Sequence, residues 1–459
     1  MDNNIYIKDV IRECNGTLVQ GDLNRKLDSF SKDTRTLEEG DTYIGIKGEN
    51  FDGNTLFKEA FSKGAKTCIL DKGTNIEDIE DYNDRDIIIV DNTLKAIETL
   101  AAYKRSLYDI PVVAVTGSVG KTSTRDLIGS VLETKYKVLK TQKNYNNNIG
   151  MPLTILSLKD EDILLLEMGM SHLGEIHLLS EIAKPTLGVI TNVGTAHIGN
   201  LGSRENILKA KLEILDGMKE KRLITNLDND IISSHINEIK EKSTVITVGL
   251  NSNATYKATD IKTGAFSNEF KINGNDYQVN AGGEAYVYNS LIAYAVGKEF
   301  DIPDKDIQKG IANFKLGENR LEKIELKNGV TLINDTYNAS LDSIKNSLKL
   351  LSDSDYNRKI VILGDVLELG EYSEEIHQSI YKEILKYNFD YLIMIGKELN
   401  KASSILKEEN YDMSKVFFFD NEKDSHDKIR NLLKKGDIAL LKGSHGMNLI
   451  NIVERLKED

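Results

Sequence analysis

Residues 116–124 form a short loop whose composition could bind phosphate; they read Thr-Gly-Ser-Val-Gly-Lys-Thr-Ser-Thr. The β-branched run Pro111–Val115 predicts a buried strand before the loop, and apolar residues at helical spacing predict a helix over Thr122–Tyr136 after it. The loop would therefore join the end of a strand to the N-terminus of a helix. Free backbone N–H groups and the positive end of the helix dipole meet there and stabilise nucleotide phosphates.

This loop is a shortened form of the usual phosphate-binding motif. The pattern G-x-x-G-K-T is present, but Val115 stands where G-x-x-x-x-G-K-[ST] has its first glycine. The alternative, a glycine-rich surface turn before an ordinary helix, is disfavoured by the flanking strand and helix. The residues expected to hold the triphosphate are Thr116, Gly117, Ser118, Val119, Gly120, Lys121, Thr122 and Ser123. Lys121 would act as a point charge, and the Thr122 hydroxyl would bind Mg²⁺.

Two further predicted strands end in polar residues that suit a metal. The strand Ile163–Leu166 runs into Glu167, and the strand Leu187–Ile190 leads to His197. Ligands of parallel α/β sheets bind outside the carboxyl ends of the strands, so these residues would share an edge with the phosphate loop. A carboxylate suits Mg²⁺, and an imidazole can join or order its ligand shell. The alternatives are a helix-capping or surface acid for Glu167 and a satisfied loop histidine for His197.

A lysine lies beside the apolar stripe of the predicted helix Ser203–Leu215. Lys211 is four residues after Ile207 and three before Ile214, both apolar. A lysine turned inward needs a partner or a lowered pKa. The alternative, a side chain that extends to solvent, is equally compatible with helical geometry.

Three polar loops are candidate substrate sites. Ser31–Arg35 and Lys47–Gly53 combine an arginine fork suited to a diphosphate with hydroxyls and amides suited to a sugar nucleotide, although two plain polar loops are the alternative. The segment Asn144–Pro152 packs four asparagines near a glycine and a proline. We expect it to form no regular element and to be a binding loop or a turn.

Size and composition exclude several classes of protein. The chain has 459 residues, 40% apolar and 29% charged, with a net charge of −13, which argues against a nucleic-acid-binding surface. No targeting segment or long apolar run is present, which predicts a cytoplasmic protein with no membrane insertion. Cys14 and Cys68 are expected to be reduced thiols, and seven histidines are too few for a histidine-based metal cage, so any metal would use oxygen ligands.

The chain divides into three expected α/β domains. Residues 1–108 alternate short strands and helices, and 109–316 hold the phosphate loop in a mostly parallel sheet, followed by hairpins over 243–280 with turns at 251–253 and 272–275. Residues 317–459 alternate strand and helix, which predicts a Rossmann-like, doubly wound sheet. No G-x-G-x-x-G follows the first strand of this last domain, so a dinucleotide is not expected there.

In this order, the motifs resemble those of the Mur ligase family over essentially the whole chain. The stretches that carry the resemblance are 31–35, 116–122, 144–152, 167–169, 192–197, 210–211, 334–339, 363–370 and 442–444. The resemblance is strongest to members that join D-alanyl-D-alanine to UDP-N-acetylmuramoyl-tripeptide. It implies an ATP-dependent ligase in which the tripeptide carboxylate attacks the γ-phosphate and the dipeptide amine then displaces phosphate from the acyl phosphate, in peptidoglycan synthesis.

The resemblance also implies roles for individual residues. Lys121, His197 and Lys211 would be catalytic, with one Mg²⁺ on Thr122 and Glu167 and a second on His197, next to Lys211 in carbamylated form. Asn289, Arg320 and Asp335 would contact the base, phosphates and ribose of ATP. The substrates would be held by Ser31, Thr34, Arg35, Lys47, Asn50, Asn144, Asn146, Asn147, Tyr337, Asn338, Lys442 and Ser444. The third domain would bind the dipeptide, and the protein would be a monomer.

Three positions depart from the family pattern, namely Asn319, Ser340-Leu341 and His445, where Gly, Asn-Pro and Arg are usual. They bear on the ATP and dipeptide contacts of the third domain. The rival interpretations are a sibling amide ligase, a nucleotide switch, and a paralogue that binds without ligating. The third domain lacks the Asp-Asn-Pro-Arg stretch expected for a diamino acid, and no Asn-Lys-x-Asp motif is present. The set Lys121, Thr122, Glu167, His197 and Lys211 is intact, which disfavours a non-catalytic paralogue.

Overall fold

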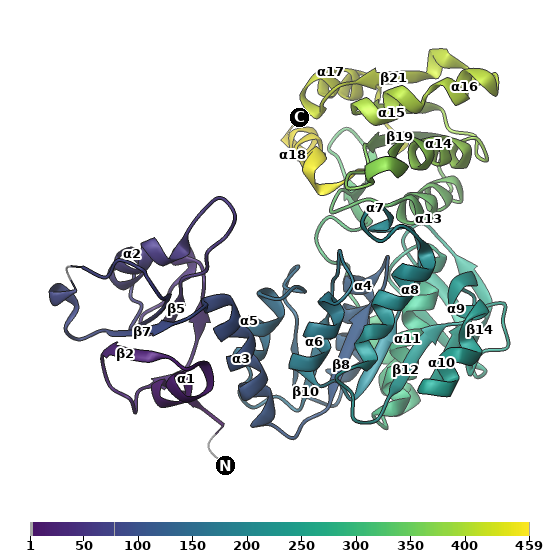
Figure 1. Ribbon diagram of the computed structural model, residues 1–459. Coiled ribbons are helices and arrows are strands. Elements are labelled where there is room, and N and C mark those ends of the chain that lie inside the picture. Colours follow the sequence, from purple (N-terminus) through teal and green to yellow (C-terminus); the bar gives the residue numbers. More distant parts are fainter. Residues whose placement is uncertain (1–2, 78, 459) are drawn as a thin grey trace. The chain divides into compact units, whose positions relative to one another are not determined.

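The computed structural model describes residues 3–77 and 79–458 and has the expected α/β class (Figure 1). The chain forms two compact units, each built from three separate segments. Unit 1 comprises Met1–Val115, Tyr136–Gly188 and Leu212–Arg222, and unit 2 comprises Thr116–Lys135, Val189–Lys211 and Leu223–Asp459.

The N-terminal part of unit 1 is a sheet flanked by short helices. Its strands lie in the order β2 (Thr17–Gln20), β7 (Asp86–Val90), β6 (Thr67–Asp71), β5 (Thr42–Ile44) and β4 (Phe30–Ser31). All neighbours pair in parallel except β2 with β7. The helices are α1 (Ile7–Cys14), α2 (Phe57–Ser62) and α3 (Thr93–Ser106). Tyr43, Phe61 and Cys68 pack in its core, and the sheet with its helices has the expected small α/β fold. Cys14 and Cys68 are both free thiols.

Unit 1 continues with three parallel strands in the order β8 (Val112–Thr116), β10 (Ile163–Glu167) and β9 (Val138–Lys140). The prediction that 144–152 contains no regular element was wrong in its second half, because α5 (Gly150–Leu156) begins there. Asn147 accepts hydrogen bonds from the first backbone N–H groups of this helix, and Pro152 lies in the first turn, where a missing N–H costs nothing. Helix α5 packs against α3.

Unit 2 carries the helix after the phosphate loop and a run of strands. The strands lie in the order β11 (Leu187–Ile190), β12 (Arg222–Asn226), β13 (Thr244–Gly249), β14 (Tyr256–Thr263), β15 (Asn268–Ile272) and β16 (Asn275–Val279). The hairpin predicted at 251–253 was wrong, because β13 and β14 pair in parallel; the hairpin at 272–275 is confirmed by antiparallel pairing of β15 and β16. The helices here are α4 (Lys121–Leu132), α8 (Arg204–Leu212), α11 (Glu284–Glu299) and α12 (Asp304–Ala312), and α4 packs against α11 and α12.

The C-terminal part of unit 2 is the expected doubly wound sheet. Its strands lie in the order β17 (Glu322–Glu325), β18 (Thr331–Asp335), β22 (Asp437–Lys442), β19 (Arg358–Gly364), β20 (Tyr391–Ile395) and β21 (Val416–Phe419). Only β17, an edge strand that sequence reasoning missed, is antiparallel. One face is covered by α13 (Leu341–Ser352) and α14 (Ser373–Ile384), and the other by α17 (Glu422–Leu432) and α18 (Ile450–Glu458) (Figure 1).

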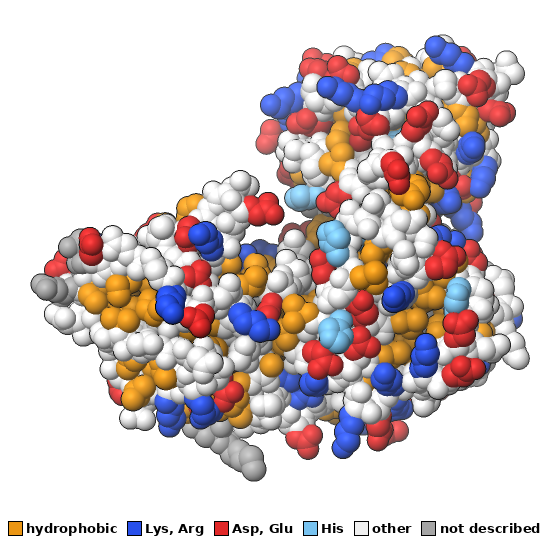
Figure 2. Space-filling model, in the orientation of Figure 1, with side chains coloured by type: hydrophobic (Ala, Val, Ile, Leu, Met, Phe, Trp, Pro, Cys, Tyr) orange, Lys and Arg blue, Asp and Glu red, His pale blue; other side chains and the backbone are white. Residues whose placement is uncertain are grey.

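On the face drawn in Figure 2, acidic and basic side chains are interspersed and no broad basic stripe is visible, in keeping with the net charge of −13. Within residues 3–77 and 79–458, no helix is long and apolar enough to cross a membrane.

The structure explains two of the three departures from the family pattern. Ser340 is the N-cap of α13, where its hydroxyl accepts from the Ser343 backbone and the Ser343 hydroxyl accepts in return from the Ser340 backbone. Asn319 has φ of 59°, a left-handed conformation that asparagine tolerates better than other non-glycine residues. Ser340 therefore supplies a helix cap, and Asn319 supplies a left-handed backbone conformation. Nothing in the structure explains His445.

Replacing Ser340 by alanine should remove this cap and destabilise the C-terminal part by about 1 kcal/mol. The measurement is the shift in the urea midpoint of the unfolding phase that a fluorophore on α13 or α14 reports. Ser352→Ala at the other end of α13 is the matched control, because no described residue hydrogen-bonds its hydroxyl. Equal midpoints for the two variants would contradict the capping role.

Candidate nucleotide and substrate sites

The phosphate loop has the backbone that its sequence predicts. Gly120 has φ of 82° and precedes the first residue of α4, Lys121. Gly117 is required by close approach, since a Cβ there would lie 1.9 Å from Thr191 Oγ1. The Lys121 ammonium donates to the Gly117 carbonyl at 2.9 Å, so it lies folded over the loop. The N-terminus of α4 and the Lys121 ammonium therefore lie together at the loop, where a phosphate group would bind.

Thr191 and Asn192, which follow β11, hold the phosphate loop from one side. Asn192 Oδ1 accepts from the Val119 N–H at 2.9 Å, and Asn192 Nδ2 donates to the Val119 carbonyl at 2.9 Å. The Thr191 hydroxyl also donates to Val119 O, and Ser118 N–H donates to Asn192 O. Thr191 and Asn192 thus hold the phosphate loop in shape. The sequence analysis did not predict this role, although Asn192 is the first residue of the motif stretch 192–197.

Lys211 on α8 faces inward, which settles the question that helical spacing alone left open. Its side chain is 1% exposed, and no residue in the described part of the chain forms a hydrogen bond or ion pair with its ammonium. Burial holds the pKa of Lys211 well below its usual range, and the charge of Lys121 lowers it further. The structure therefore places a desolvated amine in the electrostatic field of the phosphate-loop lysine.

Two more predicted nucleotide contacts, Arg320 and Asn289, lie at the start of α4. Arg320 donates to the Thr122 hydroxyl at 3.1 Å, and its guanidinium stacks 3.9 Å from the centre of the Tyr337 ring. Asn289 of α11 is nearly buried, and its Oδ1 would lie 3.5 Å from a Cβ on Gly120. The Thr122 hydroxyl, which was expected to bind Mg²⁺, therefore accepts a hydrogen bond from Arg320 in this structure.

Asp335 and Lys442, predicted to bind ATP and substrate respectively, form a buried ion pair at the ends of β18 and β22. Lys442 Nζ lies 2.6 Å from Asp335 Oδ2 and also donates to the Asn338 carbonyl. The Ser347 hydroxyl donates to the same Asp335 oxygen. Ser444 is buried, and its hydroxyl accepts from Leu367 N–H.

His197 and Glu167 lie where the strand ends predict them, each in its own unit. In unit 2, His197 has φ of 63°, and its Nδ1 is 3.9 Å from Glu368 Oε2. In unit 1, Glu167 is 2% exposed, and its Oε1 accepts from Asn146 Nδ2 at 2.7 Å. Asn146, predicted as a substrate contact, thus orients the carboxylate. Nowhere in 3–77 and 79–458 do three or more His, Cys, Asp or Glu side chains gather as a metal site.

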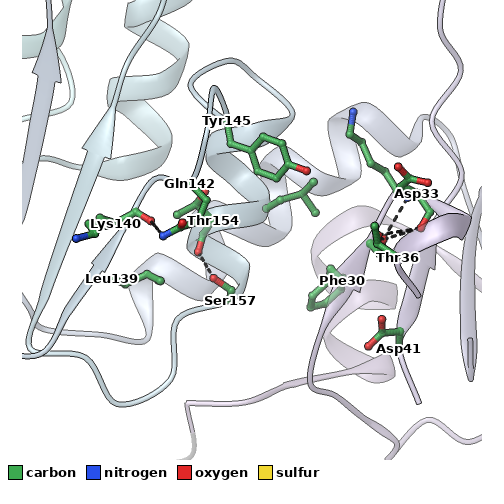
Figure 3. A pocket seen from close by; sticks show the side chains of 13 residues that line it. Phe30, Asp33, Thr36, Asp41, Leu139, Lys140, Gln142, Tyr145, Thr154 and Ser157 are labelled. Atoms are coloured by element: carbon green, nitrogen blue, oxygen red, sulfur yellow. Dashed lines mark hydrogen bonds between the residues drawn. The ribbon is translucent and has the colours of Figure 1, made fainter. Parts of the chain in front are cut away.

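Unit 1 contains a cavity of about 280 Å³ between two walls (Figure 3). One wall is formed by residues 30–41 and the other by residues 139–157, from which the Tyr145 ring points towards the first wall. Its lining is Phe30, Ser31, Lys32, Asp33, Thr36, Asp41, Leu139, Lys140, Gln142, Tyr145, Leu153, Thr154 and Ser157. The lining combines two aromatic rings, hydroxyls, an amide, two lysines and two aspartates, so it suits a polar ligand that carries a flat ring.

Of the predicted substrate contacts in unit 1, Ser31 lines this cavity and several others do not. Thr34 is buried and donates to Glu59. Arg35 pairs with Asp33 through two hydrogen bonds, which lower the pKa of Asp33 to about 2. Lys47, Asn50 and Asn144 are exposed. Gln142 and Tyr145 are lining residues that sequence reasoning missed, because only tertiary packing brings their segment to residues 30–41.

Comparison with known proteins gives consistent matches over the chain. Residues 115–297 match the Mur ligase middle domain, and residues 319–445 match the Mur ligase, glutamate ligase domain. The chain is 36% identical to the UDP-N-acetylmuramoyl-tripeptide–D-alanyl-D-alanine ligase of Bacillus subtilis, covering 98% of each chain, and 30% identical to that of Escherichia coli, covering 85% of each.

Solved structures agree. A crystal structure of MurF from Acinetobacter baumannii matches with a TM-score of 0.89 and 25% identity over 99% of each chain. MurF ligase from Thermotoga maritima in complex with ADP matches with a TM-score of 0.79 and 27% identity, covering 94% of this chain and 97% of that one.

Replacing Lys211 by methionine should raise the melting temperature by a few degrees in CO₂-free buffer, most at low pH. The unfolded lysine stays protonated up to its ordinary pKa of 10.5, whereas the folded one releases its proton at lower pH. The unfolded state thus binds more protons in that window, so the native protein gains stability as pH rises, and the advantage of the variant narrows towards pH 10.5. Lys209→Met, at an exposed position of α8, is the control. A pH-independent difference would contradict the lowered pKa.

Proposed function

The chain belongs to the Mur ligase family, and we propose that it joins D-alanyl-D-alanine to UDP-N-acetylmuramoyl-tripeptide at the expense of ATP. It is an ATP-dependent, amide-forming ligase of peptidoglycan synthesis. The observation that carries the proposal is the phosphate loop with Lys121 folded over it and the buried amine of Lys211 nearby, in a chain that matches such ligases end to end.

The reaction has two displacements. The terminal carboxylate of the tripeptide attacks the γ-phosphorus of ATP, which gives an acyl phosphate and ADP. The dipeptide amine then attacks the acyl carbon, loses a proton and expels inorganic phosphate as the amide forms. Lys121 and the N–H groups at the start of α4 spread the negative charge that develops on the transferring phosphoryl group. Arg320, now on the Thr122 hydroxyl, moves onto the phosphates when ATP binds.

In this proposal two Mg²⁺ ions would bind, and the chain offers three ordinary ligand types for them. Glu167, held by Asn146, and Thr122 offer a carboxylate and a hydroxyl, and His197 offers an imidazole. The neutral Lys211 amine can add to CO₂ with loss of a proton, and the carbamate would offer an anionic ligand at a position where a protonated lysine would be costly. When bound, the ions would supply charge neutralisation of the phosphate oxygens.

The remaining assignments follow the same proposal. The cavity beside Ser31 and Tyr145 takes the uridine end of the sugar nucleotide, with Lys32 and Lys140 near its phosphates. Arg35 joins after it leaves Asp33, and Thr34, Lys47, Asn50, Asn144 and Asn147 complete that region. Asn289 and Asp335 contact the nucleoside, while Tyr337, Asn338, Lys442 and Ser444 face the dipeptide. The domains are 1–108, 109–316 and 317–459, in a cytoplasmic monomer.

Phosphate release from ATP, measured with the UDP-N-acetylmuramoyl-tripeptide and with or without D-Ala-D-Ala, tests the function. We expect release that depends on the dipeptide and a pentapeptide product by mass spectrometry. Release driven by single amino acids would assign a sibling ligase, and nucleotide binding without release would assign a binding paralogue.

Replacing Lys211 by alanine should lower activity by at least about a hundredfold, because an anionic ligand and its field are lost together. Short-chain carboxylates in solution should restore part of it by filling the vacated space. Lys209→Ala should behave as the unchanged protein under both conditions. Full activity of Lys211→Ala without added carboxylate would remove this lysine from the site.

A further inference from the structure

Asp342 of the C-terminal part contacts the segment that follows β11. Its Oδ2 accepts from the Thr195 backbone N–H at 3.0 Å and lies 3.4 Å from the Thr195 hydroxyl. A Cβ on Gly194 would lie 2.1 Å from the same oxygen, so the carboxylate fits against a bare backbone. The contact joins helix α13 to a segment 147 residues away in sequence.

The segment 191–195 is in turn bound to the phosphate loop. Gly194 N–H donates to the Ser118 hydroxyl at 2.9 Å, and Asn192 pairs in both directions with Val119. Val193 O accepts from Arg204 and Asn229. Residues 192, 193 and 194 are therefore each held by hydrogen bonds. A displacement of Thr195 would consequently be transmitted to the phosphate loop.

Asp342 is not needed to start its own helix. The first turn of α13 already has the Ser340–Ser343 capping box, and Asp342 directs its Oδ2 away from the helix to Thr195. A first-turn carboxylate that served only the helix dipole would gain nothing from this contact. The geometry thus calls for a role outside the helix.

We propose that Asp342 is a positioning residue that braces the phosphate loop through Thr195 and Gly194. The inference rests on the proposed function, because it assigns the residue to the same ATP site. If Asp342 has this role, the conformation of the phosphate loop depends on the contact between helix α13 and Thr195. The residue does not touch the reacting atoms; it acts through the loop that does.

The test compares Asp342→Ala, Asp342→Asn and Gly194→Ala with the unchanged protein in steady-state assays and in ADP-binding titrations. Loss of the acceptor should lower kcat/KM for ATP about tenfold, which is about 1.4 kcal/mol, and weaken ADP binding, with KM for the sugar nucleotide within about twofold. Asp342→Asn keeps an acceptor oxygen and should recover most of the loss. Asp424→Ala removes a first-turn acid of α17 whose carboxylate, among residues 3–77 and 79–458, accepts from Asn421 alone, and this variant should change nothing.

A double variant decides whether the two residues act through one contact. The methyl group of Gly194→Ala displaces the Asp342 carboxylate, so Gly194→Ala combined with Asp342→Ala should be no worse than either change alone. Multiplied losses, or an Asp342→Ala variant that behaves as Asp424→Ala, would overturn the proposal. So would a loss that raises all three KM values together with a lowered melting temperature.

Failure of the proposed function gives a different pattern. The unchanged protein would then show no dipeptide-dependent turnover, while ADP titration would still compare the variants. Equal ADP affinity of Asp342→Ala and the unchanged protein would overturn the brace whatever reaction the enzyme performs.

Discussion

The hydrogen bonds between Asn192 and Val119 are the constraint on which the ATP site depends. The N–H groups of Ser118 and Val119 are bonded to Asn192, so phosphate would be bound by the N–H groups at the start of α4. Here one asparagine side chain pairs with the N–H and the carbonyl of the same residue, and Thr191 and Gly117 meet at a distance that admits no side chain. The segment after β11 therefore fixes the shape of this shortened loop.

The second constraint is the burial of charge. Lys211 is 1% exposed and has no anionic partner among the described residues, and this burial holds its pKa well below the usual range. The Asp335–Lys442 pair shows the contrasting solution, in which both charges are buried together and further hydrogen bonds satisfy them. Burial thus leaves the Lys211 amine without a carboxylate partner among the described residues, whereas Lys442 is paired with the carboxylate of Asp335.

In this structure, several side chains of the nucleotide region are paired with each other. Arg320 lies on Thr122 and Tyr337, Lys121 lies on Gly117, and Arg35 lies on Asp33. Each of these cations therefore already has a hydrogen-bonding or stacking partner within the protein.

Local periodicity and the chemically distinctive motifs around Lys121, Glu167 and His197 are enough to predict the α/β class, most strand positions and the residues at strand ends. The sequence left open whether Lys211 faces inward, and it missed the parallel pairing of β13 with β14. It also missed Asn192, Asp342 and Tyr145 as functional positions. Only the tertiary structure decided these points, because a hydrogen bond across 147 residues or a cavity between residues 30–41 and 139–157 leaves no local pattern in the chain.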